Sequence, residues 1–327
     1  MTEGKKPGPT DNAFLGPLKA GSEEATYAGA LSFMRRRYSR DLAGVDAAVW
    51  GIPFDTAVSN RPGTRFGPQA IRRASAIFDG DPQYPFGLDP FERLTVIDYG
   101  DCAFETGVYS EIPARIAAEA AAIVERGVHL FTLGGDHFVT YPLLKAHAAK
   151  YGPLALVQFD AHQDTWPSKG DGISHGSFVA RAAREGLIDT GRSIQIGIRT
   201  HAPEDCGIEI VYGHEIDRIG IDGVIDRVKA RVGAAKAYMT FDIDCLDPAF
   251  APGTGTPVAG GLSSAEALDI VRGLRGLDLV GADVVEVAPA YDVSEITAIA
   301  AATIAHDILC LMALRKGAVE RPVGRLR

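Results

Sequence analysis

The feature that most constrains the fold is the alternation of short apolar runs with segments of helical periodicity. The predicted strands are 46–53, 94–99, 129–133, 154–160, 193–198, 208–212, 237–243 and 279–286. Most of them are continuously apolar, which indicates burial on both faces of a sheet. Helices are predicted near 67–78, 110–127, 139–150, 177–187, 222–233, 263–275 and 295–315, with Asp222 and Ser263 as N-caps. This alternation predicts an α/β fold of three layers, α/β/α, with a mostly parallel sheet.

Length, charge and cysteine content limit the class of protein. The chain has 327 residues, of which 46% are hydrophobic, enough for a large core in one domain. We predict a polar N-terminal arm at 1–25 and a single catalytic domain over 26–327. The net charge is −9 and no basic cluster stands out, which argues against nucleic acid as a partner. Four scattered cysteines, an N-terminus without an apolar core and no apolar run of membrane-span length predict a cytoplasmic protein with no membrane contact.

Acidic and histidine residues gather at the ends of three predicted strands. The three motifs are Gly134-Gly135-Asp136-His137, Phe159-Asp160-Ala161-His162-Gln163-Asp164 and Phe241-Asp242-Ile243-Asp244. Residues two apart on a strand point the same way, so the ligands of each motif can face one side if the strand geometry continues to its end. The carboxyl ends of parallel strands are where α/β sheets bind ligands. We therefore expect the three motifs to meet at one edge of the sheet.

The composition of the three motifs predicts a pair of divalent cations. Four aspartates carry four negative charges, which two such ions would balance, whereas one ion would leave repulsion in a partly buried site. Oxygen and imidazole donors without thiolate suit Mn²⁺, with Ni²⁺, Co²⁺ or Zn²⁺ as possible substitutes. Two ions about 3.5–4 Å apart can lower the pKa of a shared water, which favours hydrolysis. A lone Asp-x-Asp is more often a cap or turn, so the prediction depends on all three motifs together.

The chain resembles the ureohydrolases, the family of arginases, agmatinases and related guanidino hydrolases. The resemblance is carried by GGDH, FDAHQD and FDIDCLDPAFAPGTGTP, and extends through GIPFDTAVSNRPGTRFGPQAIRRAS and GADVVEVAPAYDVSEITAIAAAT. The resemblance covers almost the whole chain, which is more similar to agmatinases than to arginases. It implies one arginase-like domain with an eight-stranded parallel sheet, commonly assembled as a homo-oligomer, a trimer or hexamer. It also implies cleavage of a small guanidino substrate to urea and an amine.

The resemblance also implies roles for individual residues. One Mn²⁺ would be bound by His137, Asp160, Asp164 and Asp242, and the other by Asp160, His162, Asp242 and Asp244, so that Asp160 and Asp242 bridge. Glu286 matches the glutamate that receives the guanidinium group, which a carboxylate can pair with bidentately. His175 matches a histidine proposed as a proton shuttle. Either Asp164 or His175 would then supply a proton to the departing amine.

The identity of the substrate stays open between two classes. Agmatine is the first expectation, giving putrescine and urea. Many agmatinases carry an acid immediately before the shuttle histidine, where this chain has Ser174. A guanidino acid such as 4-guanidinobutyrate or 3-guanidinopropionate, or another small guanidine compound, is therefore the alternative. Its carboxylate could be received by Ser174, Lys169 or Arg61, although Arg61 is equally expected to make a subunit contact.

Two further function classes are less favoured by the sequence. A non-catalytic paralogue that assembles with an active partner usually lacks metal ligands, whereas all six are present here. A metal-dependent deacetylase or phosphatase would use similar donors, but would not account for the setting of Glu286 or for the length of the resemblance.

Overall fold

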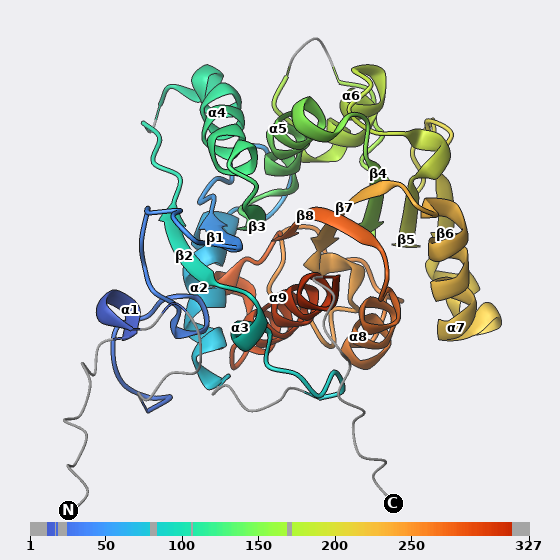
Figure 1. Ribbon diagram of the computed structural model, residues 1–327. Helices are drawn as coiled ribbons and strands as arrows, with labels where there is room; N and C mark the ends of the chain where they lie inside the picture. The colour runs from blue at the N-terminus through green and yellow to red at the C-terminus, as the bar shows by residue number, and fades with distance from the viewer. Residues whose placement is uncertain are drawn as a thin grey trace, which may run out of the picture.

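The fold is built around one parallel β-sheet. The computed structural model describes residues 12–16, 18, 25–78, 84–105, 107–168 and 172–315, so the predicted arm at 1–25 lies largely outside the described residues. Within them, eight strands form a sheet in the order β2-β1-β3-β8-β7-β4-β5-β6, and all neighbouring strands are parallel. The strands are β1 (Ala47–Gly51), β2 (Val96–Asp101), β3 (His129–Leu133), β4 (Ala155–Phe159), β5 (Ile194–Ile198), β6 (Glu209–Tyr212), β7 (Lys236–Asp242) and β8 (Asp278–Val285) (Figure 1). The predicted fold class and all eight predicted strands are confirmed.

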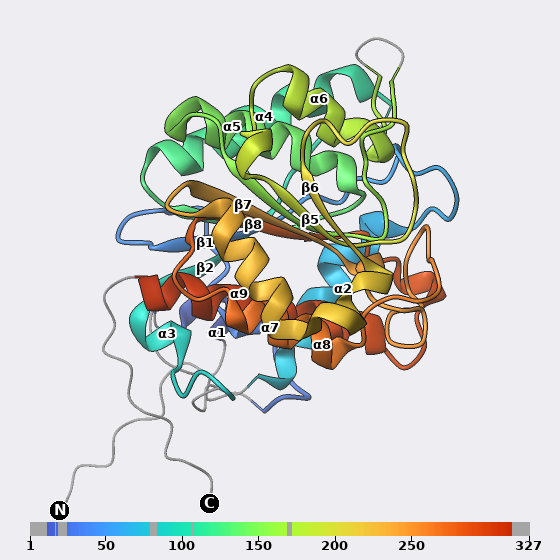
Figure 2. The ribbon, with the colours of Figure 1, turned by 90° about the vertical axis from the view of Figure 1, so that its right-hand side faces the viewer.

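Helices cover both faces of the sheet (Figure 2). One layer contains α4 (Ile112–Glu125), α5 (Thr140–Tyr151) and α6 (Phe178–Arg184), and the other contains α2 (Gly67–Ala74), α7 (Gly213–Val232), α8 (Ser264–Gly273) and α9 (Ile296–Arg315). Two short helices, α1 (Asn12–Leu15) and α3 (Pro90–Arg93), complete the α-helices of the described residues. Two clusters of buried apolar side chains form the core between the sheet and the helices on its two faces. The mostly apolar composition of the strands is therefore explained by burial on both faces.

The predicted helix start was right at α8, whereas at α7 only the second part of the helix was predicted. At α8 the Ser263 hydroxyl accepts a hydrogen bond from the Glu266 backbone N–H (3.2 Å), and the Glu266 carboxylate accepts one from the Ser263 N–H (2.8 Å), as its capping-box spacing predicted. The helix predicted near 222–233 is the part of α7 that follows Gly220, whereas the part of α7 that begins at Gly213 was not predicted. Gly220, at φ 71°, interrupts the helical backbone between the two parts, so the periodicity is continuous only beyond it.

The expectation that no apolar run reaches membrane-span length was wrong for α9. This helix has 20 residues, a mean hydropathy of 1.8 over an 18-residue window, and 78% of that window is buried inside the protein. It packs against α2, α8 and β8. Its apolar composition is accounted for by this packing, because such a helix is surrounded by protein on most sides.

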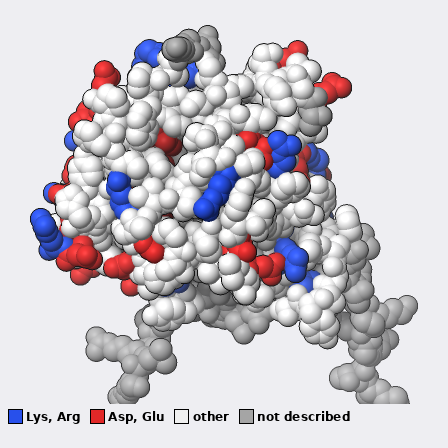
Figure 3. All heavy atoms as spheres, turned by 180° about the vertical axis from the view of Figure 1, so that it is seen from behind, with Lys and Arg blue, Asp and Glu red and all other residues white. Residues whose placement is uncertain are grey.

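The sheet order brings the predicted site residues together. His137 follows β3, Asp160 follows β4, Asp242 ends β7 and Glu286 follows β8, and these four strands are adjacent at the centre of the sheet, in the order β3-β8-β7-β4. Figure 2 shows the loops that follow β1, in blue, and β7, in orange, at the right-hand edge of the sheet. Figure 3, the view from behind, shows acidic and basic side chains scattered over the face without a continuous basic patch.

Candidate metal centre and active site

The first group of donors surrounds one ring nitrogen of His137. Its Nδ1 lies 3.0 Å from Asp160 Oδ2, 3.1 Å from Asp164 Oδ2 and 3.1 Å from Asp242 Oδ2. The His137 side chain is buried, and Nδ1 has no hydrogen-bond partner. Three carboxylate oxygens and one imidazole nitrogen therefore converge on one point. Oxygen and nitrogen donors in this arrangement can hold a divalent cation.

A second group of donors shares Asp160 with the first. His162 Nδ1 lies 3.1 Å from Asp244 Oδ2 and 3.4 Å from Asp160 Oδ1. Asp160 thus turns one oxygen toward each histidine, which is the arrangement of a bridging carboxylate. Both triplets, His137-Asp160-Asp164 and Asp160-His162-Asp244, are close enough to hold a metal ion. The structure brings all six predicted ligands together, whereas their assignment to individual ions stays a prediction.

The predicted ligands converge through tight turns, because the strand geometry does not continue through the motifs. β4 ends at Phe159, and the Asp160 carboxylate accepts the His162 backbone N–H at 2.6 Å. The Asp242 carboxylate likewise accepts the Asp244 N–H at 2.8 Å. Asp164 has φ 52°, a left-handed conformation that is rare outside glycine. Side-chain-to-backbone hydrogen bonds compete with strand pairing and turn the chain here.

The protonation of these groups shows how strongly they interact. Although burial opposes it, the carboxylates around His137 raise its pKa well above the usual value, and the charge of Asp244 raises the pKa of His162 to about 12. Burial and the neighbouring Asp160 charge raise the pKa of Asp164 to about 6. Burial raises the pKa of Asp242 as well. The cluster therefore draws positive charge strongly, which a divalent cation can provide in place of protons.

Glu286 lies beside this cluster with one oxygen paired and one unpaired. Its Oε1 accepts the His137 backbone N–H at 2.9 Å and contacts His175 Nδ1 at 2.9 Å. Its Oε2 is buried and has no hydrogen-bond partner. Glu286 has φ 64°, and its N–H donates to the Gly135 carbonyl at 2.8 Å. Gly135 is required there because a Cβ would lie 1.7 Å from the Phe54 carbonyl oxygen. The positive φ of Glu286 is a strained backbone conformation, and strain of this kind is typical of functional positions.

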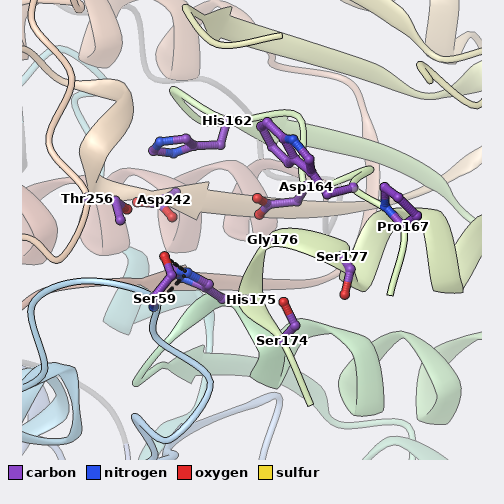
Figure 4. Close-up of a pocket in the computed structure, with 11 residues that line it drawn as sticks. Ser59, His162, Asp164, Pro167, Ser174, His175, Gly176, Ser177, Asp242 and Thr256 are labelled. Atoms are coloured by element: carbon purple, nitrogen blue, oxygen red, sulfur yellow. Dashed lines mark hydrogen bonds between the residues drawn. The ribbon is translucent and has the colours of Figure 1, made fainter. Parts of the chain in front are cut away.

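His175 is held at both ring nitrogens. The Ser59 backbone N–H donates to Nε2 at 3.1 Å, and the Ser59 hydroxyl lies 2.8 Å from the same atom (Figure 4). An acceptor at Nε2 leaves the proton of the neutral ring on Nδ1, from which it is donated to Glu286. Although burial opposes it, the hydrogen bond and charge of Glu286 raise the pKa of His175 to about 9. The Ser59 N–H acts to lower this pKa, because it can donate to Nε2 only when the ring is neutral.

A cavity of about 310 Å³ opens above these groups. It is lined by Ser59, His162, Asp164, Trp166, Pro167, Ser174, His175, Gly176, Ser177, Asp242 and Thr256. Figure 4 shows Ser59 on one loop, Ser174, His175 and Ser177 together on a second segment, and His162 on a third. None of these lining residues is a lysine or arginine. The described wall of the cavity therefore combines aspartates, histidines, hydroxyl groups and an aromatic ring, and its carboxylates suit a small cationic molecule.

Two of the other residues predicted to lie near the substrate, Ser174 and Arg61, are among the described residues. Ser174 lines the cavity, as expected of a residue next to the substrate. Arg61 places its guanidinium over the Tyr291 ring, 5.1 Å from the centroid, and is not among the lining residues. Lys169 lies outside the described residues. Cys245, next to Asp244, is buried.

Several residues that support the site were not identified from the sequence. Gln158 donates to Asp160 Oδ2 at 2.7 Å, and Thr256 donates to Asp244 Oδ2 at 3.2 Å. Thr240 and Asp283 lie behind His137, inside strands β7 and β8. A signal was available for Asp283, because a charged residue within an apolar strand requires buried partners. Ser59 gave no such signal, since its role depends on a loop folding onto a distant histidine.

The comparisons with known proteins agree with this geometry. The model of the Arginase family matches residues 45–311. A protein of Chromobacterium violaceum named agmatinase is 55% identical over 301 residues, which are 91% of this chain and 94% of the relative. The crystal structure of a hypothetical agmatinase from Burkholderia thailandensis is 53% identical, with a TM-score of 0.93 over 94% of this chain and 99% of that chain. Proclavaminate amidino hydrolase from Streptomyces clavuligerus is 37% identical, with a TM-score of 0.85 over 89% of this chain and 99% of that chain.

Proposed function

The chain belongs to the arginase family, and from this premise we propose that it is an amidinohydrolase that cleaves agmatine to putrescine and urea. The observation that carries the proposal is the unpaired, buried Glu286 Oε2 beside a cluster of four aspartates and two histidines. A buried carboxylate oxygen without a partner is costly, and a guanidinium N–H is a fitting donor for it. The relatives named agmatinase support agmatine as the source of that group.

We assign the six donors to two divalent cations, with Mn²⁺ as the expected metal and Ni²⁺, Co²⁺ or Zn²⁺ as substitutes. The donors fit this assignment because a carboxylate oxygen of Asp160 faces each histidine and no thiolate takes part. When bound, such a pair supplies a water of lowered pKa and positive charge next to the reacting carbon. His137, Asp160, Asp164 and Asp242 would hold one ion, and His162 and Asp244, with the bridging carboxylates, the other.

The remaining residues position the substrate and move protons. Glu286 pairs with the guanidinium and holds its carbon close to the metal ligands. Because Oε1 is already occupied by His137 N–H and His175, the guanidinium is directed to Oε2. The departing amine nitrogen needs a proton. His175 and Asp164, both lining the cavity, are the proposed donors.

The lining of the cavity favours a cationic tail on the substrate. Agmatine carries an ammonium at the end opposite its guanidinium, and the cavity offers the face of Trp166 and the hydroxyls of Ser174 and Ser177. A guanidino acid would bring a carboxylate next to the aspartates of a wall whose described lining residues include no lysine or arginine. Ser174, where many agmatinases have an acid, is the observation that keeps the guanidino acid as a second candidate. Cytoplasmic location and homo-oligomeric assembly as a trimer or hexamer complete the proposal.

The proposal is tested by urea release from a panel of substrates. The purified chain, loaded with Mn²⁺ or with Ni²⁺, is assayed with agmatine, 4-guanidinobutyrate, 3-guanidinopropionate and arginine. We expect the highest kcat/KM with agmatine. A preference for a guanidino acid would replace the substrate but retain the reaction. No urea from any of the four, in protein that binds two metal ions, would refute the reaction itself.

A further inference from the structure

A buried carboxylate lies behind the metal centre and touches none of the proposed ligands directly. Asp283 is in β8, directly opposite Thr240 of β7, and is fully buried. Three hydroxyl groups donate to it: Thr240 Oγ1 to Oδ1 at 2.5 Å, and Tyr238 OH and Thr140 Oγ1 to Oδ2 at 2.7 and 2.9 Å. These donors satisfy both oxygens of the carboxylate. They come from β7 and from the first turn of α5, the helix that follows His137.

The direction of these hydrogen bonds determines what Thr240 can offer to His137. A hydroxyl group has one proton, and the Thr240 proton is directed at Asp283. Thr240 Oγ1 also lies 2.8 Å from His137 Nε2, so at this contact the oxygen must accept and Nε2 must carry the hydrogen. Nδ1, the atom surrounded by Asp160, Asp164 and Asp242, is then the nitrogen whose lone pair is available. Only this nitrogen can be a metal ligand in that position.

We propose that Asp283, acting through Thr240, holds His137 with its hydrogen on Nε2 and its Nδ1 lone pair directed at the cation. This inference rests on the proposed metal centre. Asp283 and Thr240 are positioning residues, because neither reaches the metal ligands' carboxylates or the cavity. The arrangement also orients the ring, which is packed against Phe178 with centroids 4.5 Å apart. Partners of this kind behind a metal ligand change metal affinity by about 10- to 100-fold when they are removed.

The variant Thr240→Val tests the proposal, with two matched controls. It replaces the hydroxyl by a methyl group of similar size, so His137 Nε2 loses its acceptor. Thr240→Ser restores the hydroxyl. Thr140→Val removes a different hydroxyl from the same carboxylate without touching His137. Mn²⁺ binding to metal-free protein is followed by the electron paramagnetic resonance signal of free Mn²⁺, and folding by thermal unfolding.

We expect Thr240→Val to weaken the binding of one Mn²⁺ by about 10- to 100-fold, and Thr240→Ser to restore it. Thr140→Val should change this affinity by less than about threefold, well below that range. In a His137→Ala background, the further change Thr240→Val should have almost no effect, because the two residues act as one unit. Asp283→Asn should also weaken the binding of this Mn²⁺, because the asparagine amide can donate to Thr240 and reverse the direction of its hydroxyl group.

Specific results would overturn the inference. Wild-type affinity in a folded Thr240→Val variant would do so, as would an equal loss in Thr140→Val, which would indicate a purely structural network. An undiminished effect of Thr240→Val in the His137→Ala background would show that Thr240 does not act through that histidine. These results would leave the proposed function intact. A wild-type protein that binds no divalent ion would instead overturn the metal centre and this inference with it.

Discussion

Replacing Glu286 by glutamine should impair catalysis far more than folding. The two hydrogen bonds at Oε1, from the His137 N–H and from His175, can still be accepted by an amide oxygen, although more weakly because the charge is lost. The amide NH₂ then takes the position of Oε2, which is buried and unpaired. A guanidinium N–H placed there would meet a donor instead of a charged acceptor. The change therefore removes the charged acceptor of the guanidinium, and it also lowers the pKa of His175, which the charge of Glu286 raises.

The expected size of the effect follows from the loss of one charge-assisted pair. Such a hydrogen bond contributes about 1.5–3 kcal/mol, which corresponds to roughly a 10- to 100-fold loss in kcat/KM. The loss is larger if the pair also orients the guanidinium carbon for attack. Because both bonds at Oε1 are retained, the thermal unfolding midpoint and the metal content should stay close to those of the wild type.

The assay is urea release from agmatine, with putrescine as a competitive inhibitor. Putrescine has no guanidinium group, so its inhibition constant should change little in Glu286→Gln. A matched control is Glu185→Gln, which removes the same charge at a glutamate that pairs with Tyr141 away from the cavity and should leave kcat/KM unchanged. An unchanged kcat/KM in folded, metal-loaded Glu286→Gln would remove this residue from the mechanism.

Three other predictions concern the metal centre and the substrate tail. Asp160→Asn and Asp242→Asn should each abolish turnover and lower the metal content, and full activity with one equivalent of metal would refute the two-ion scheme. Removing the ions from the wild type should lower its thermal stability, because the clustered carboxylates lose a ligand that binds only the folded state. Mn²⁺ affinity should rise between about pH 6 and pH 8, by about tenfold per pH unit for each proton displaced, because neighbouring carboxylates keep the pKa of His137 high and that of Asp164 is about 6. Protons occupy these groups at lower pH and must leave before the metal binds, so an affinity independent of pH would contradict the coupling. Ser174→Asp should raise kcat/KM for agmatine and lower it for 4-guanidinobutyrate, and a wild-type preference for the acid that the aspartate weakens would show that the substrates are ranked wrongly.

The amino-acid sequence by itself determined the layered fold and the identity of the donors. Short, mostly apolar runs such as Ala155–Phe159 alternate with helical patterns, which indicates strands buried on both faces and helices on each side of the sheet. The three motifs follow three of those runs, and parallel strands bring their carboxyl ends to one edge. These local patterns are sufficient to predict from the sequence alone that His137, Asp160 and Asp242 are neighbours.

The helix boundaries were harder to predict, for an identifiable reason. α7 was expected from Asp222, although it begins at Gly213, because the left-handed Gly220 breaks the pattern that a continuous helix would show. α9 is mostly apolar because it packs against α2, α8 and β8, with most of its length buried. Composition alone does not distinguish this helix from a membrane span, because protein and lipid both exclude water from its surface.

The tertiary structure decided which atoms of the site face one another. Asp160 and Asp164 converge through tight turns and a left-handed backbone, which no strand periodicity encodes. Ser59 contacts His175, and Thr240 contacts His137, across separations of 116 and 103 residues. These contacts set which nitrogen of each histidine carries a hydrogen. The reason is physical: hydrogen-bond direction depends on distances of a few ångströms between segments that only the packed sheet brings together.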